Sequence, residues 1–521
     1  MKLKFRLRSQ KSNGKVEVWP LEQKNPRGRQ KLFLFVTDTY DRAKIFFANL
    51  KKSYILMTKR EKIGASVFLL IAMVLMGARS YRSYIVETVS APDRGGAYTE
   101  AMVGEVKFLN PIVAKTDAEK SVTRLMFQGL VKVTGPNTVL PDAAESYEIS
   151  SDGTKYTFHL KSDNQFSDGQ PLTANDVAQT VAKIQDPSLK SPIFKTWSGV
   201  TTEIIDDKTI EFVLQKAYGP FIFDCDFGII PAHLSPDDFS KSLVGSGPFK
   251  FIKSVTADGG KISQVDLVRN DAYSGDKPYL DSATILFLSN IHEAVNQFMT
   301  DTKTNAVFGA EPPSSAKLDY NSSRELALIF NLRKDALKDV AVRQKILSGG
   351  KFDQPLNLTL ATLDAPRQHT RATDLAKKFA AENIKVKINY YDSAGFQDHI
   401  VKKDYDLILY GFDFGDDRDP YTYWHSSQIN DLNLAGWSDK ASDILMEDAR
   451  MLPDAVARNV KYDEVFTAIQ SGAIAEFYEP IRYKYYVKPQ VKGIRSITGT
   501  QVYSRFDTIG KWYIDEKRVK K

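Results

Sequence analysis

Runs of alternating apolar and polar residues predict a series of short strands from about residue 155 onward. In Lys155–Lys161 apolar side chains recur at every second position, which is the period of a half-buried strand. Similar runs predict strands at Thr209–Gln215, Lys261–Val268, Ala283–Leu288 and Pro355–Leu360. Tyr405–Gly411 is a continuous apolar run bounded by charged residues, which is typical of a strand buried on both faces.

Apolar residues at helical spacing predict helices between these strands. Thr173–Ile184 places its apolar residues on one face, and Thr173 is the expected N-cap. Thr370–Glu382 and Ala441–Met451 also fit helices. There is no repeat of fixed period and no long Pro-rich or Gly/Ser-rich linker. The alternation of strands and helices predicts an α/β fold with several sheets.

One segment has a different pattern, because Ile63–Ala78 contains sixteen residues without a charge. Lys62 and Arg79 flank it and can reach the lipid headgroups. A cleaved signal peptide or a buried core helix would also be apolar, but residues 1–62 are too long for an ordinary signal peptide. We therefore expect one N-terminal transmembrane helix at residues 63–78, which acts as an uncleaved signal anchor.

The positive charge of the chain lies before this segment. Residues 1–62 contain 17 Lys+Arg and 5 Asp+Glu, whereas residues 63–521 contain 54 and 59. Because positive residues stay on the cytoplasmic side, we expect residues 1–62 to form a basic cytoplasmic leader and the C-terminal domain to be extracytoplasmic. Within the leader, Lys31–Leu56 fits either an amphipathic helix on the inner leaflet or a flexible stretch. The mildly acidic remainder predicts no nucleic-acid partner.

The residues with catalytic or metal-binding chemistry do not form a familiar motif. Cys225 is the only cysteine, so neither an intrachain disulfide nor a CxxC zinc site can form, and we expect this thiol in the core. His292 begins a sequence similar to a zinc-protease motif, but Asn296 stands where the second histidine belongs. No Walker or dinucleotide-binding glycine motif is present. The sequence therefore predicts no cofactor, no metal site and no catalytic residue.

An ordered set of motifs covers nearly the whole region from Gly95 to the C-terminus. Its most specific block is Leu140–Val177, LPDAAESYEISSDGTKYTFHLKSDNQFSDGQPLTANDV. The other motifs, in order, are FLNP at 108–111, FQGL at 127–130, VGSGPF at 244–249, NDAYSGDKPYLD at 270–281, VAVRQKI at 340–346, YDLILYGFDFGDDRDP at 405–420 and VKPQVKGI at 487–494. This set resembles the family 5 extracellular solute-binding proteins of ABC importers, which include oligopeptide-, dipeptide- and nickel-binding proteins.

The resemblance implies a periplasmic-binding-protein fold of type II, in which two α/β lobes and an inserted domain surround the solute. By position, lobe I would comprise residues 93–129, 244–330 and 480–521, the inserted domain residues 130–243 and the distal lobe residues 331–479. Family members usually carry several dozen residues after the VRxAI helix. Here Arg343–Gly350 leads almost directly to the next strand, so we expect a shortened distal lobe.

The resemblance also places the candidate ligand site in the acidic turn before Pro420. Peptide-binding members commonly hold the ligand's α-ammonium with an aspartate of this turn, and a partly desolvated carboxylate makes a strong charge-assisted hydrogen bond. The family spacing selects Asp416, with Asp417 and Asp413 as neighbours if the register slips. The nearby aromatic residues expected to stack against the ligand are Tyr421, Tyr423, Trp424 and Trp437. The alternatives are a solvated turn for the acids and core packing for the aromatic rings.

The function implied by the resemblance is the capture of peptides or similar solutes at the outer face of a bacterial cell membrane, without catalysis. The expected partners are a peptide or small solute, an ABC permease, and the lipid bilayer through residues 63–78. A membrane-tethered peptide-sensing receptor that signals through residues 1–62 is the alternative. A hydrolase on the same fold ranks lower, because no nucleophile and base pair is evident.

Overall fold

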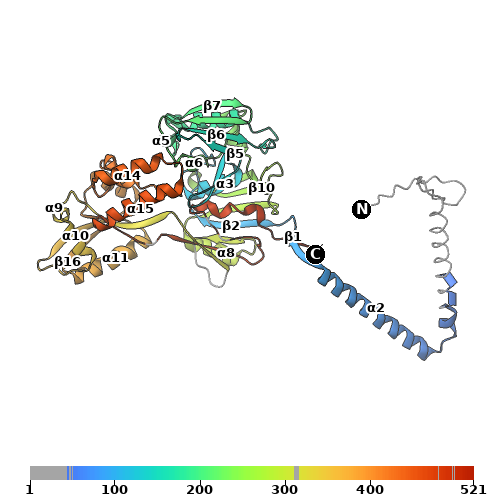
Figure 1. The fold of residues 1–521 in the computed structure, drawn as a ribbon. Helices are drawn as coiled ribbons and strands as arrows, with labels where there is room; N and C mark the ends of the chain where they lie inside the picture. Colours follow the sequence, from blue (N-terminus) through green and yellow to red (C-terminus); the bar gives the residue numbers. More distant parts are fainter. Residues whose placement is uncertain are drawn as a thin grey trace. The chain divides into compact units, whose positions relative to one another are not determined.

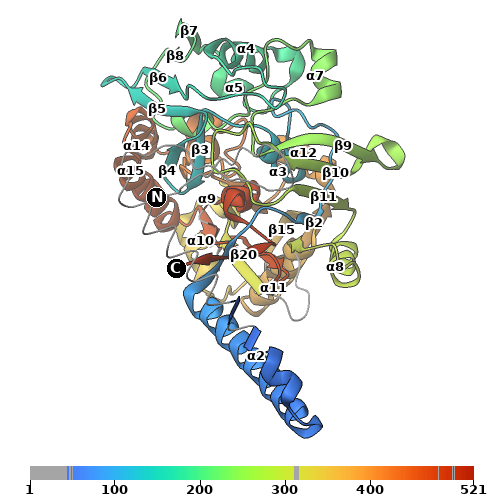
Figure 2. The same cartoon turned by 90° about the vertical axis from the view of Figure 1, so that its right-hand side faces the viewer.

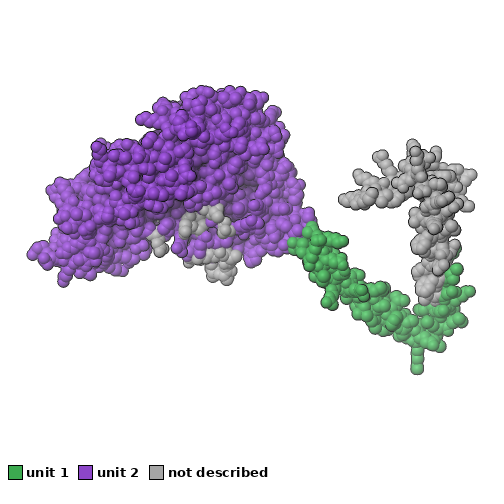
Figure 3. All heavy atoms as spheres, in the orientation of Figure 1, with its two compact units in different colours: residues 1–90, 518–521 green, residues 91–517 purple. Residues whose placement is uncertain are grey.

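The computed structural model describes residues 44–45, 48–49, 51–309, 316–478, 480–495, 497 and 499–521. The chain divides into two compact units, which Figure 3 colours separately. Unit 1 comprises residues 1–90 and 518–521, and unit 2 comprises residues 91–517. Most of the leader predicted at residues 1–62, with most of Lys31–Leu56, lies outside the described residues.

Unit 1 contains one long helix, α2 (Lys59–Glu87), which Figure 1 shows as a continuous coil. Thr58 and Glu61 form a capping box at its start, where Glu61 Oε2 accepts a hydrogen bond from the Thr58 N–H at 2.8 Å. In the described part of the chain, α2 is the one helix long and apolar enough to cross a membrane by length and composition. None of its side chains is buried. The helix includes the predicted segment 63–78 and extends beyond it at both ends.

The C-terminal strand pairs with the strand that follows α2. These strands are β20 (Glu516–Lys520) and β1 (Thr88–Pro92), and they form a two-stranded sheet. Arg518 donates to Thr88 Oγ1 at 2.8 Å and to the carbonyl oxygen of Ile85 at 3.0 Å. The last residues of the chain are therefore fixed to the end of α2.

The first sheet of unit 2 has seven strands in the order β13-β19-β12-β2-β11-β10-β9. The helices that accompany it are α3 (Asp117–Met126) and α8 (Ile291–Thr300). β2 runs parallel to β11 and β12, and the other pairs are antiparallel. The strands are β2 (Ala97–Val103), β9 (Phe249–Thr256), β10 (Ile262–Arg269), β11 (Ser282–Leu288), β12 (Ala306–Phe308), β13 (Ala316–Asn321) and β19 (Arg482–Val487).

An inserted region separates α3 from β9 and carries its own sheet, seen at the top of Figure 2. Its core forms around Trp197, which is fully buried with its ring centroid 4.8 Å from that of Phe221 and 5.0 Å from that of Phe212. The four-stranded sheet has the order β5-β6-β8-β7, and β3 and β4 form a hairpin. The elements are β3 (Val131–Gly135), β4 (Thr138–Pro141), β5 (Ala144–Ile149), β6 (Lys155–Leu160), α4 (Ala174–Ile184), α5 (Phe194–Trp197), β7 (Thr201–Asp206), β8 (Thr209–Val213), α6 (Phe221–Asp224) and α7 (Pro236–Ser242).

The distal lobe is built on a five-stranded sheet in the order β16-β15-β17-β14-β18. Strand β17 (Leu407–Asp413) lies at its centre, and Leu407, Ile408 and Leu409 are buried, as the continuous apolar run predicted. The other strands are β14 (Arg324–Phe330), β15 (Leu356–Leu363), β16 (Ile384–Tyr391) and β18 (Ala475–Phe477). The helices are α9 (Asp335–Lys338), α10 (Val340–Leu347), α11 (Pro366–Ala381), α12 (Ser393–Lys402), α13 (Tyr421–Trp424), α14 (Lys440–Met451) and α15 (Ala455–Ser471).

Strand β14 differs from its expected place. The sequence assigned residues 324–330 to lobe I, but β14 pairs antiparallel with β17 over seven residues and with β18 on its other side. The reason is that Leu326, Leu328 and Phe330 are buried in the distal core. The chain therefore enters the distal sheet between β13 and β14.

A buried ion pair joins the first sheet to the C-terminal segment η4 (Val502–Phe506). Arg505 donates to Glu100 Oε1 from Nε at 2.9 Å and from Nη2 at 2.7 Å, and both side chains are 0% exposed. Tyr485 donates to the other oxygen of Glu100 at 2.8 Å. Removing one partner of such a pair leaves an uncompensated buried charge, which costs about 3–5 kcal/mol. The pair thus holds η4, including Tyr503, against β2.

Candidate solute-binding site

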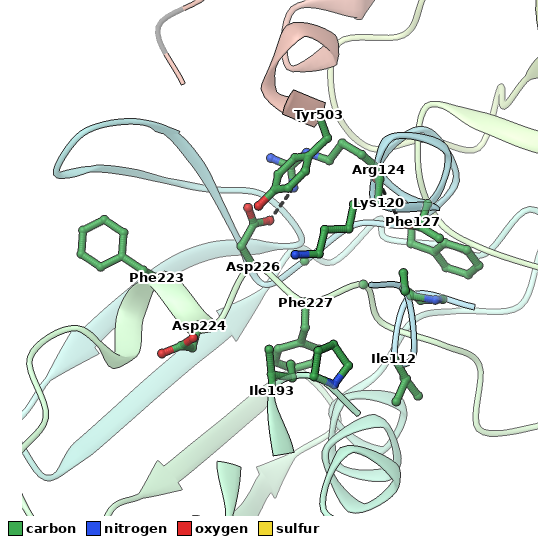
Figure 4. A pocket seen from close by; sticks show the side chains of 16 residues that line it. Ile112, Lys120, Arg124, Phe127, Ile193, Phe223, Asp224, Asp226, Phe227 and Tyr503 are labelled. Atoms are coloured by element: carbon green, nitrogen blue, oxygen red, sulfur yellow. Dashed lines mark hydrogen bonds and ion pairs between the residues drawn. The ribbon is translucent and has the colours of Figure 1, made fainter. Parts of the chain in front are cut away.

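Several cavities border the inserted region, and two of them are named here by their lining. The inner cavity, about 310 Å³, is lined by α3 and the loop before it, by residues 192–193 and 223–228, and by Tyr503 (Figure 4). The turn cavity, about 580 Å³, lies between residues 195–218 of the inserted region and residues 413–450 of the distal lobe. Both volumes fall in the range of small-molecule sites, which is about 300–1,000 Å³.

The inserted region and the distal lobe touch beside the turn cavity. The Gly219 N–H donates to the Arg450 carbonyl at 2.7 Å, and a Cβ on Gly219 would lie 1.8 Å from the Leu452 carbonyl oxygen. Only glycine permits this close backbone approach. The Arg450 guanidinium lies 4.9 Å from the ring centroid of Tyr218 and pairs with Asp419 at 2.8 Å. This contact closes one side of the turn cavity.

Asp413, predicted as a neighbour of the ligand site, lines the turn cavity but is engaged by the protein. It accepts hydrogen bonds from Ser323 at 2.5 Å and from Arg324 at 3.1 Å. Burial opposes ionisation, but these bonds and the charge of Arg324 lower the pKa of Asp413. Arg324 also makes two 2.7 Å bonds to Asp117 at the start of α3. Asp413 therefore belongs to a bridge between the distal sheet and α3.

Asp417 is also engaged by the protein. It is 6% exposed and pairs with the buried Arg458 of α15, and Tyr462 donates to its second oxygen at 3.3 Å. Burial raises the pKa of Asp417 to about 6, against the effect of Arg458. In this structure Asp417 fixes the turn to α15.

Asp416, the residue selected by the family spacing, faces the C-terminal segment. Its carboxylate accepts a hydrogen bond from Thr500 at 2.7 Å, and its carbonyl accepts one from the Asn137 N–H of the β3–β4 hairpin at 3.3 Å. Burial raises the pKa of Asp416. Asp416 lines neither the inner cavity nor the turn cavity.

The four predicted aromatic residues divide into two pairs. Tyr421 and Tyr423 line the turn cavity. Tyr421 stacks on His425 and carries the Arg450 guanidinium 4.1 Å from its ring centroid. Trp424 and Trp437 are 1% and 9% exposed and pack in the distal core. These two rings offer a solute no surface in this conformation, because the apolar core of the lobe surrounds them.

The inner cavity contains charged groups that the motif comparison did not select. Arg124 pairs with Asp226 and with Asp507 (2.9 Å), and all three side chains are 7–8% exposed. Burial opposes the charge of Arg124, but the two carboxylates raise its pKa well above its usual value. Figure 4 shows Asp226 pointing to Arg124 and Tyr503, with the Lys120 amine reaching into the same space.

Lys120 and Asp224 also line the inner cavity. Within the part of the chain that the structure describes, neither side chain has a hydrogen bond or ion pair. Burial raises the pKa of Asp224 to about 7, and Asp417 and Asp419 add to this, while Arg450 opposes it. The sequence contains one indication of this site. The carboxylates of Asp224 and Asp226 interrupt the apolar run Phe221–Ile230.

The comparisons with known proteins agree with this architecture. Residues 138–349 match the family model of the bacterial extracellular solute-binding proteins, family 5, middle region. This match confirms the resemblance seen in the sequence. Among curated relatives, the oligopeptide-binding protein AppA of Bacillus subtilis is 22% identical, and the alignment covers 86% of this chain and 98% of that protein. The nickel-binding periplasmic protein of Escherichia coli is 28% identical over 39% of this chain and 38% of its own length.

The fold is also that of solved substrate-binding proteins. The ABC transporter substrate-binding protein CtaP from Listeria monocytogenes superposes with a TM-score of 0.69 at 20% identity, covering 81% of this chain and 100% of that one. The α/β fold of the periplasmic-binding-protein type II class is thereby confirmed for the region that superposes.

The raised pKa of Asp224 predicts a pH-dependent contribution to stability. Its pKa is about 7 in the folded chain and 3.8 in the unfolded chain, so the folded state binds more protons between these values. The free energy of unfolding therefore falls as the pH rises from about 4 to about 7. Asp224→Asn removes this contribution. The difference between the unfolding midpoint of the variant and that of the wild type should therefore rise, in favour of the variant, as the pH increases from about 4 to about 7. Parallel midpoint curves for the two proteins from pH 4 to pH 8 would contradict the assignment.

Proposed function

We propose that this chain is an extracytoplasmic solute-binding protein that captures a small peptide or a similar solute for an ABC permease. The observation that carries the proposal is the inner cavity, a partly enclosed space that combines apolar walls with a few charged groups. Such a combination is typical of small-molecule sites. The family match supports a binding role, and the relatives reported above are binding proteins by name.

The size of the inner cavity favours a small solute over a long peptide. The inner cavity holds about 310 Å³, near the lower limit for ligand sites. The distal lobe is short after α10, since only eight residues separate Leu347 from Leu356 of β15. A short lobe provides less wall for an extended chain, so we propose a solute of two or three residues.

We further propose that α2 anchors the protein in the cell membrane. Its exposed apolar side chains include Phe68, Leu70 and Leu75, and such residues are stabilised by lipid. The Lys and Arg excess before α2 supports a cytoplasmic N-terminus, with the rest of the chain on the outer side.

Binding of a peptide should stabilise the folded chain. The full chain in detergent is heated with and without an equimolar pool of di- and tripeptides, and unfolding is followed by tryptophan fluorescence. A peptide at 100 times its Kd adds roughly 2.7 kcal/mol to the free energy of unfolding, which raises the midpoint by a few degrees. A pool of sugars at the same concentration serves as the control and should leave the midpoint unchanged. No shift with any peptide would contradict the proposed solute.

Anchoring should depend on the apolar face of α2. Leu69→Arg combined with Val74→Arg places two charges in the apolar segment, each costing about 2.5–3.5 kcal/mol there. We expect the wild type to stay in the membrane pellet after alkaline carbonate washing and the double variant to be released. Ile444→Arg, an exposed substitution in the distal lobe, is the matched control and should behave as the wild type. Release of the wild-type protein would exclude α2 as an anchor.

A further inference from the structure

We infer that the end of α2 that follows its apolar segment forms, together with strand β20, a basic collar that binds the headgroups of anionic phospholipids. The collar comprises five side chains, which are those of Arg79, Arg82, Arg518, Lys520 and Lys521. The inference rests on the anchoring of α2 proposed above, and it names the class of lipid that this end of the anchor selects.

The first observation is the charge of this end of the helix. Residues 79–87 and 518–521 contain the five basic side chains and a single acidic one, that of Glu87. All five basic residues are exposed, and within the described part of the chain none of them forms an ion pair with an acidic side chain. Segments on the outer side of a membrane are usually poor in Lys and Arg. The collar is therefore complementary to a negatively charged surface.

The second observation is that β20 runs back toward α2, because it pairs antiparallel with β1. The Asp93 N–H donates to the Asp515 carbonyl at 2.9 Å, and the Lys521 N–H donates to the Glu87 carbonyl at 2.9 Å. A rising residue number in one strand thus meets a falling number in the other. Residue 521 therefore lies level with the last residue of α2, where Figure 1 shows the end of the chain beside β1.

Arg518 fixes this arrangement and closes the end of α2. It donates to the Thr88 carbonyl at 2.9 Å and to the Ile85 carbonyl at 3.0 Å, at the point where a helix leaves its last carbonyl groups unpaired. Its guanidinium also lies 5.6 Å from the ring centroid of Tyr84. Because strand side chains alternate, Lys520 lies on the same face of β20 as Arg518. Cations from a segment 430 residues away in the sequence thus reach the end of the helix.

The third observation is the height of these cations above the hydrocarbon core. The sixteen residues 63–78 span about 24 Å as a helix along the membrane normal, whereas the core is about 30 Å thick. The core therefore ends about two residues beyond Ala78, and a headgroup layer of about 5–8 Å ends at about residues 83–85. Arg79 and Arg82 lie at or within this layer. Residue 521, level with Glu87, lies about 3–6 Å above it, which is less than the screening length of about 8 Å at physiological salt.

An anionic headgroup suits this collar better than a zwitterionic one. In phosphatidylcholine the positive choline offsets the charge of the phosphate, whereas phosphatidylglycerol keeps a net negative charge. The guanidinium groups of Arg79 and Arg82 can also bind phosphate oxygens in a bidentate manner. Each Lys or Arg close to an anionic surface strengthens the attraction roughly fivefold. The collar should therefore gather anionic lipid around this end of the anchor.

The test measures which lipid lies beside the end of α2. Val86→Cys introduces a thiol at an exposed position of the full chain for a fluorescent label, while Cys225 is buried and stays unlabelled in the folded protein. The labelled chain is placed in nanodiscs of phosphatidylcholine and phosphatidylglycerol, in which equal amounts of one lipid or the other carry a nitroxide quencher near the headgroup. Because a nitroxide quenches only nearby fluorophores, lipids gathered by the leader at the other end of α2 do not contribute.

For the wild type we expect phosphatidylglycerol to be enriched roughly fivefold or more beside the label at low salt. The enrichment should fall at high salt, because the charges of the collar are exposed and are therefore screened.

Paired substitutions assign the enrichment to β20. Lys520→Gln combined with Lys521→Gln should lower the enrichment severalfold, while quenching by phosphatidylcholine persists. The matched control is Lys377→Gln combined with Lys385→Gln, which removes two exposed charges of the distal lobe and should leave the enrichment unchanged. The unfolding midpoint of each variant, measured in parallel, establishes that it is folded.

The outcomes separate this inference from the proposed anchoring. Equal quenching by the two lipids in the wild type, or an enrichment that the substitutions at Lys520 and Lys521 leave intact, overturns the inference and leaves the anchor standing. The comparison of lipids on the wild type decides this even if a variant does not fold. If neither lipid quenches the label, α2 does not enter the bilayer, and the anchoring proposal fails together with the inference.

Discussion

The candidate site depends on Arg124, a buried guanidinium shared between two buried carboxylates. Its partners come from distant parts of the chain, because Asp226 lies in the inserted region and Asp507 follows η4. Leaving any one of these charges unpaired would cost several kcal/mol, so the three segments are held together as one wall. Arg124 and Asp226 both line the inner cavity, so this pairing shapes one part of its wall.

Pairing between carboxylates and arginines also accounts for the acidic turn after β17. Four aspartates within seven residues first suggest a ligand site, but Asp413, Asp417 and Asp419 each pair with an arginine. Through Arg324 and Arg450 these pairs connect the distal lobe to α3 and to the inserted region. The turn thus performs a structural task, which is to join the lobes around the cavities.

The pattern of apolar and polar residues predicted most of the strands and helices, because buried positions recur along the chain with the period of each element. Lys155–Lys161 became β6, Thr173–Ile184 became α4 and the apolar run at 405–411 became the central strand β17. The sequence did not predict that β14 belongs to the distal sheet. Its pairing with β17 is a long-range interaction, which the local alternation of apolar and polar residues does not encode. The site was harder to predict, because whether a carboxylate is free depends on arginines far away in sequence. Asp417 and Arg458 are 41 residues apart, and Arg124 and Asp507 are 383 apart.

The central claim is the proposal that this chain captures a small peptide or a similar solute. The most direct measurement is mass spectrometric identification of the solute released when the full chain, purified from its own membrane without added ligand, is denatured. The account predicts a single class of compound the size of a di- or tripeptide, released in near-equimolar amount. Release of a long peptide, or of no solute, would contradict it.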